Sequence, residues 1–298
     1  MTPAQCRLAV LRARNAPVAV VLRRGPSKHT LVLRWDLTRH TFDEGHWFAG
    51  RLYPERCDLS PDGAWMVYFA AKFKGPIPTY TALSRPPWLT AHALWPELGT
   101  WGGGGVFVDP HTLALNRVGG SLDSALDHAL PAGLRLAYRD ASGPGPTAPA
   151  RGLGWRVAAL DPRRPREAPV RPSYPAKPPQ RLVRDNPRVP GLLLEEIFWG
   201  CLHPGAPFAI RSHHLVFADP SLDRALGDVE WADWLDDGSL VFARRGALFL
   251  QQIQQLPRDP TFATARCLID LAPRTFARRR CPPEAAPRGP TPGRRARG

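Results

Sequence analysis

The chain of 298 residues is 43% hydrophobic, so it can bury the core of one large domain or of two smaller ones. Its five cysteines form no C-x-x-C pair, which excludes a disulfide scaffold and a zinc ribbon, and no metal or other cofactor is expected. The formal net charge of +14 raises the question of an anionic partner, which the distribution of that charge has to answer.

The first residues do not have the composition of a signal peptide, because Arg7, Arg12 and Arg14 interrupt their apolar stretch. No apolar run reaches the roughly 18 residues that a membrane-spanning helix needs. We therefore expect a cytoplasmic protein with no membrane partner.

Segments rich in branched and aromatic residues, bounded by Gly, Pro, Asn and Asp, predict short strands along the whole chain. Grouped in repeats of about 40–50 residues, they predict an all-β fold, a β-propeller of about five blades. The first two blades are expected to hold residues 18–23, 29–35 and 47–52, then 56–59, 65–71, 80–84 and 89–95. The third is expected to hold residues 106–108, 112–116 and 134–138, with 155–160 as a late strand. The last two are expected to hold residues 192–199 and 207–218, then 229–234, 239–243, 247–251 and 266–270.

Two segments carry helical signals. Residues 122–130 have the apolar spacing of a short helix. Residues 192–198 are ambiguous, because Glu195 and Glu196 favour a helix whereas the flanking aromatic residues favour a strand.

The stretch CDLSPDGAWMVYFAAKF, residues 57–73, has the pattern of a strand, a tight turn and a second strand. Pro61 has the φ that the second position of a turn needs, and Gly63 accepts a positive φ. A helix that begins at Ser60 is the alternative. The pattern recurs in WADWLDDGSLVFARRGALFL, residues 231–250, and in a degenerate form in GVFVDPHTLALN, residues 105–116.

The x-S-P-D-G-x-x-x-V-Y pattern resembles the repeat of TolB-like and WD40-like β-propellers, which implies an inner strand followed by the next strand of a blade. The runs RRGPSKHTLVLRWDLTRHTFDEGHWFAGRLYPERCDLSPDG and WLTAHALWPELGTWGGGGVF resemble a family of uncharacterised bacterial proteins. That resemblance implies no activity and no catalytic residues.

Proline and arginine are concentrated in two segments, residues 141–190 and 278–298, which carry +7 and +6 of the +14 charge. The rest of the chain is nearly neutral at +1. We expect residues 1–281 to form one propeller-like domain, with 141–190 as an irregular or disordered insertion and 282–298 as a disordered basic tail. Nucleic acid is then a partner only through flexible basic segments, unless the charge merely reflects codon usage.

Asp58 and Asp233 occupy matching positions in the two closest repeats. If both lie on innermost strands, their carboxylates converge at the propeller axis and can hold a cation or act as acid and base. The alternative, which we favour, is that each aspartate bonds backbone N–H groups of its own turn.

Other polar clusters favour structural roles. WGGGG, residues 101–105, lacks the Gly-Lys-Ser/Thr of a phosphate loop, and close backbone packing explains its glycines. RHTFDEGHW, residues 39–47, holds ligand-type side chains without the spacing of a metal site, and Asp-Glu-Gly is also a hairpin turn. His203, His213 and His214 are close in sequence, but adjacent strand residues point to opposite faces.

Several of the ten tryptophans are candidates for contact with a partner, since Trp is a frequent interface anchor. The binding residues that we predict are Asp58, Asp233, Trp88, Trp101 and Trp231. We favour a non-catalytic propeller that binds a protein partner or ligand on one face. The alternatives are a hydrolase or lyase with an axial carboxylate or histidine site, and sequence-independent binding of an anionic polymer by the Arg-rich segments.

Overall fold

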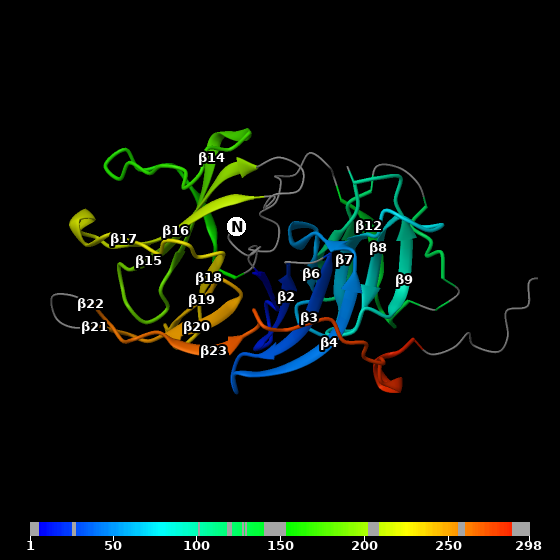
Figure 1. Ribbon diagram of the computed structural model, residues 1–298. Coiled ribbons are helices and arrows are strands. Elements are labelled where there is room, and N and C mark those ends of the chain that lie inside the picture. Colours follow the sequence, from blue (N-terminus) through cyan, green and yellow to red (C-terminus); the bar gives the residue numbers. More distant parts are fainter. Residues whose placement is uncertain are drawn as a thin grey trace, which may run out of the picture. The chain divides into compact units, whose positions relative to one another are not determined.

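The computed structural model describes residues 6–25, 28–100, 102–117, 121–126, 128, 130–139, 153–201, 209–255 and 260–287. The chain is all-β, and its five larger sheets form the blades of a five-bladed β-propeller. It divides into two compact units (Figure 1). Unit 1 comprises Met1–Ala4, Ala9–Pro149 and Arg274–Gly298, and unit 2 comprises Gln5–Leu8 and Ala150–Pro273.

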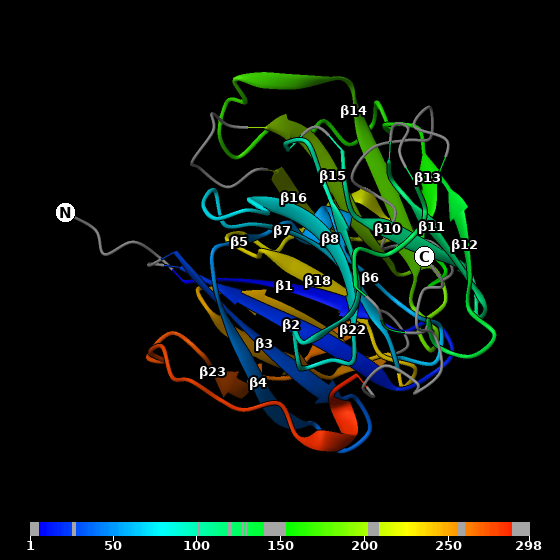
Figure 2. The same ribbon diagram turned by 90° about the vertical axis from the view of Figure 1, so that its right-hand side faces the viewer.

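The first sheet of unit 1 has the strand order β1-β2-β3-β4, and Figure 2 shows β2, β3 and β4 lying side by side. Strand β1, which the sequence pattern did not predict, adds a fourth strand to the predicted blade. The strands are β1 (Arg7–Arg12), β2 (Val18–Arg24), β3 (His29–Asp36) and β4 (Thr41–Ala49).

The second sheet contains the predicted strand-turn-strand unit. Strand β7 pairs with β5, β6 and β8, and β8 pairs with β9. All six residues of β7 are buried, because alternate side chains enter two different cores. The strands are β5 (Arg51–Leu52), β6 (Asp58–Leu59), β7 (Met66–Ala71), β8 (Thr79–Ser84) and β9 (Ala91–Pro96), and helix η1 (Pro54–Arg56) connects β5 to β6.

The third sheet is short and mixed, since β11 is antiparallel to β10 and parallel to β12. Its strands are β10 (Gly105–Asp109), β11 (Thr112–Leu115) and β12 (Arg135–Tyr138). The helix predicted over residues 122–130 is wrong, because the described residues there form bends without helical bonding. Ser124 instead accepts the Leu94 N–H at 3.0 Å through its hydroxyl, so the segment is tied to β9.

Two apolar cores hold the sheets of unit 1 together. Met66, Tyr68 and Ala70 of β7 pack with residues of the first sheet, whereas Val67 packs with Phe107 of the third. The alternation of β7 explains why this central strand is a continuous apolar run rather than an alternating one.

Unit 2 contains the last two blades. Figure 1 shows β18, β19, β20 and β23 as the yellow-to-orange sheet. The strands of its larger sheet are β13 (Arg156–Ala158), β14 (Tyr174–Asp185), β15 (Leu193–Cys201), β16 (Ile210–Val216) and β17 (Arg224–Ala225). The other sheet has β18 (Trp231–Trp234), β19 (Leu240–Arg244), β20 (Ala247–Gln251) and β23 (Arg266–Asp270), and a separate hairpin has β21 (Ile253–Gln255) and β22 (Pro260–Phe262).

The expectation of irregular structure across residues 141–190 is wrong for Tyr174–Asp185, which forms the 12-residue strand β14. The strand expected at 155–160 is present as β13, but it pairs with β14 and not with the third blade. The ambiguous residues 192–198 fall largely in strand β15, and Leu194 there packs against Trp234 in the core of unit 2. Residues 140–152 lie outside the described part of the chain.

The remaining short helices are η3 (Pro220–Leu222) and η4 (Pro283–Ala285). Residues 282–287, which the sequence assigned to the tail, include η4 with a buried Ala285, whereas 288–298 lie outside the described residues. Within the described ranges, no helix is long and apolar enough to cross a membrane.

Candidate binding pocket and the predicted site residues

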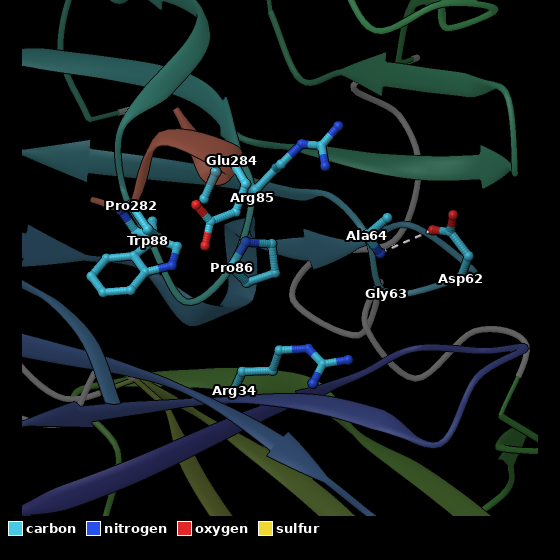
Figure 3. A pocket seen from close by; sticks show the side chains of 10 residues that line it. Arg34, Asp62, Gly63, Ala64, Arg85, Pro86, Trp88, Pro282 and Glu284 are labelled. Carbon is cyan, nitrogen blue, oxygen red and sulfur yellow. Dashed lines mark hydrogen bonds between the residues drawn. The ribbon is translucent and has the colours of Figure 1, made fainter. Parts of the chain in front are cut away.

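A pocket of about 350 Å³ opens in unit 1 (Figure 3). It combines two guanidinium groups, two carboxylates and one large aromatic ring with proline walls. Figure 3 shows Arg34 entering from one side, on β3, while Pro86 and Trp88 line the opposite side. The lining residues are Arg34, Asp62, Gly63, Ala64, Arg85, Pro86, Trp88, Pro282, Glu284 and Ala285.

The predicted Ser-Pro-Asp-Gly turn forms one wall of this pocket. The Asp62 carboxylate accepts the Ser60 hydroxyl at 2.5 Å and the Ala64 N–H at 3.0 Å, and Gly63 has φ +72°. Asp62 thus satisfies its own turn, the role that small polar residues take in tight turns. These hydrogen bonds lie within the turn and fix its conformation, so the turn forms a rigid edge of the pocket.

The connection between β8 and β9 forms the second wall. Trp88 donates its backbone N–H to the Arg85 carbonyl at 2.9 Å, which closes a tight turn. The Trp88 ring contacts His46 edge-on, with the ring centroids 5.1 Å apart. Burial lowers the pKa of His46, and its neutral Nδ1 accepts the Leu89 N–H at 3.1 Å. These contacts hold Trp88 in place from the side of β4.

The C-terminal segment forms the third wall. Glu44 of β4 binds both Arg274, at 2.9 Å, and Arg279, at 2.7 Å. Further along, Ala285 is buried and its carbonyl lies 3.0 Å from His92 Nε2. Residues 274–287 are therefore attached to the first and second sheets, and they bring Glu284 to the pocket.

Asp58 lies on β6, and its carboxylate binds residues far from its own turn. It accepts the Phe107 N–H at 2.8 Å and pairs with Arg14 at 3.2 Å, and Arg14 also donates to the Phe107 carbonyl. Desolvation raises the pKa of Asp58 to about 6, against the opposing effects of Arg14 and the Phe107 N–H. The carboxylate thus joins three sheets of unit 1.

Asp233 has the same kind of partner in unit 2. Its Oδ1 accepts the Trp234 N–H at 2.9 Å and a short ion-pair contact from Arg184. Asn186 binds the turn between β18 and β19, since its side-chain amide donates to the Gly238 carbonyl at 2.9 Å. In both copies of the recurrent sequence unit, the aspartate therefore pairs with an arginine from an earlier part of the chain.

The predicted tryptophans have different environments. Trp88 lines the pocket, whereas Trp231 is half-buried at the start of β18, opposite Ala243 of β19. Trp101 lies outside the described residues. Of the four predicted binding residues that lie in the described ranges, only Trp88 lines the pocket.

The glycines after Trp101 are explained by packing. Gly103 has φ +91°, and a Cβ added there would lie 2.3 Å from the ring of Phe69. Gly104 has φ +82°, and its Cβ would lie 2.2 Å from the Arg56 carbonyl oxygen. A side chain at Gly103 would collide with the buried Phe69 ring, and one at Gly104 with the Arg56 backbone, which supports the expected role in close backbone packing.

No metal-type cluster forms from the predicted histidines and acids among the described residues. Asp43, Glu44 and Gly45 lie within β4, so the hairpin turn expected there is wrong. His213 is bonded to Glu196 at 3.2 Å, whereas His214 lies opposite Glu195 in the sheet. His203 lies outside the described residues.

Several arginines of the proposed insertion are buried in ion pairs. Arg166 and Arg181 both bind Glu195, at 3.0 and 2.6 Å, and Arg166 and Arg164 both bind Asp223, at 2.7 and 2.9 Å. The three arginine side chains are between 9% and 16% exposed. Their charge is neutralised within unit 2, so it is not displayed on a flexible segment.

Sequence reasoning missed Arg34, Arg85 and Glu284 as pocket residues. Arg85 directly precedes Pro86-Pro87-Trp88 in the sequence, so its position next to the predicted Trp88 could have identified it as a pocket residue. Arg34 lies in a different blade from Trp88, and Glu284 lies almost 200 residues away in the sequence. Only the three-dimensional arrangement brings them together.

No protein-family model and no curated protein matches the chain. The five-bladed β-propeller itself is the part of the resemblance that the structure supports.

Proposed function

We propose that the protein is a non-catalytic binding protein that engages a protein partner or ligand at the pocket beside Trp88. The observation that carries the proposal is this pocket, which is lined by a partly exposed tryptophan and two arginines. Its volume of about 350 Å³ falls within the range of sites that bind small ligands or single side chains. Propellers are compatible with such a role, although a fold alone does not define a function.

The internal bonding of the aspartates supports binding over catalysis. A general acid or base needs to reach a substrate proton. Asp58 is 2% exposed and bonded to Arg14 and Phe107, and Asp233 is 2% exposed and bonded to Arg184. Both side chains therefore support a structural role more directly than a catalytic one.

The ion pairs of unit 2 weaken the case for an anionic polymer as partner. That case relied on the arginines of residues 141–190 and 278–298, and four of the first segment, Arg164, Arg166, Arg181 and Arg184, are paired with carboxylates and only slightly exposed. A phosphate backbone would have to displace these pairs before it could bind them.

Quantitative affinity capture with the full chain tests the proposal. A partner that wild-type protein and Trp231→Ala retain equally, and that Trp88→Ala loses, supports the pocket as the binding site. A partner lost only with Trp231→Ala, or retained by Trp88→Ala, contradicts it. Thermal unfolding of both variants shows that they are folded.

A further inference from the structure

We infer that the group bound in the Trp88 pocket is a carboxylate carried next to an apolar moiety. This inference rests on the proposed function and specifies its ligand. The carboxylate can belong to an acidic peptide segment of a partner or to a free organic acid, since both present the same chemistry to the pocket.

The two pocket arginines have unused hydrogen-bonding capacity. Among the described residues the Arg85 side chain has no hydrogen-bond or ion-pair partner, and its guanidinium carbon lies 4.7 Å from the centroid of the Trp65 ring. Arg34 has an ion pair of 3.9 Å with Asp43, whose side chain is 73% exposed. Such exposed, long pairs contribute little. Each guanidinium offers five N–H donors in a geometry that matches a carboxylate.

Among the described residues, neither carboxylate of the pocket pairs with these two arginines. Asp62 accepts two hydrogen bonds inside its own turn. Glu284 is exposed and, within the described part of the chain, makes no hydrogen bond or ion pair. The arginine donors of the pocket are thus not paired with its two carboxylates, and the unpaired Glu284 carboxylate opposes the entry of an anion.

The non-polar residues that line the pocket indicate that the ligand also has an apolar part. Trp88, Pro86 and Pro282 supply flat, non-polar surface beside the arginines (Figure 3). A volume of about 350 Å³ corresponds to about twelve water molecules, so the pocket accommodates one aromatic or branched side chain with its acid group. A bare anion would leave the Trp88 surface uncovered.

Two small probes of the same carbon skeleton and opposite charge test the inference on the full chain. Phenylpropionate is expected to bind, as measured by calorimetry, and phenylpropylamine is not. Arg85→Gln and Arg34→Gln should each weaken phenylpropionate binding about tenfold, because each removes a charge-assisted hydrogen bond. Arg39→Gln, which changes an exposed arginine outside the pocket, is the matched control and should have no effect.

The direction in which Glu284→Gln changes the affinity shows whether the pocket prefers an anionic or a cationic ligand. It should strengthen the binding of phenylpropionate a few-fold, because it removes a repulsive carboxylate. Tighter binding of the amine to wild type, with loss in Glu284→Gln, would show a cation site and overturn the inference. Failure of both probes to bind would also overturn it, while the capture experiment with Trp88→Ala judges the proposed function separately.

A blocked peptide that contains one Phe-Asp pair then identifies the source of the carboxylate. Binding of this peptide, with loss when its Asp is replaced by Asn, indicates a peptide partner. Binding of phenylpropionate but not of the peptide indicates a free organic acid. Both outcomes support the carboxylate, whereas equal binding of the Asn peptide contradicts it.

Discussion

Arg14 and Asp58 form a 3.2 Å ion pair that also includes the backbone of Phe107. The pair joins the residues after β1, strand β6 and strand β10, so one carboxylate connects three sheets of unit 1. Arg184 and Asp233 repeat the pairing in unit 2. A buried pair of this kind is costly to break, because the remaining charge stays buried without a partner.

We predict that Arg14→Met destabilises the protein by about 3 kcal/mol at pH 8 and by much less at pH 5. Arg14 favours the ionised form of Asp58, whose pKa burial raises to about 6. Below that pH the carboxyl is protonated in the folded protein and no longer needs the cation. Denaturant unfolding at the two pH values measures the difference.

Arg34→Met is the control, since the Arg34–Asp43 pair is long and exposed. Its effect should stay below about 1 kcal/mol at both pH values. An Arg14→Met penalty that is the same at pH 5 and pH 8 would show that Arg14 acts through packing and not through the charge of Asp58.

We predict that Gly103→Ala destabilises the protein by about 2–4 kcal/mol, because its Cβ meets the buried Phe69 ring and its φ is positive. Gly75→Ala has a similar φ of +79° but no neighbour within 4 Å, so it should cost only about 1 kcal/mol. Urea unfolding compares the two. Equal losses would mean that backbone conformation alone, and not contact with Phe69, requires the glycine.

The blades could be predicted from the sequence because their strands and turns have local sequence patterns. Gly63 and Gly238 follow short turn motifs, and apolar runs such as that of β7 mark strands buried on both faces. By contrast, β14 was missed because Pro and Arg dominate its neighbourhood. Its Arg181 is buried only because Glu195 of the next strand neutralises it, and no local pattern shows that pairing.

The candidate site was predictable only in part. Trp88 was identified by its residue type and flanking prolines, and it lies in the pocket. Arg34 and Glu284 reach the pocket from distant parts of the chain, so composition could not associate them with Trp88. Asp58 was recognised from the repeat, but its bond to Phe107 depends on how the second and third sheets pack.

The last prediction concerns Glu196, a largely buried carboxylate of β15. Desolvation raises its pKa, but Arg211 at 3.0 Å and His213 at 3.2 Å more than offset this, and the pKa lies at about 2. The corresponding stability is present above the ordinary carboxyl pKa of about 4.5 and is lost as the pH falls toward 2.

We therefore expect acid to destabilise unit 2 by an amount on the order of 3 kcal/mol through this one group. Glu196→Gln should flatten the loss of stability between pH 4.5 and pH 2, and it should destabilise the protein at neutral pH, because Arg211 then lacks its carboxylate. Glu167→Gln, an exposed change in the same unit, is the control and should leave the acid profile unchanged. Unfolding free energies measured across this pH range decide the matter, since a Glu196→Gln profile parallel to that of wild type would show that other carboxyls cause the acid lability.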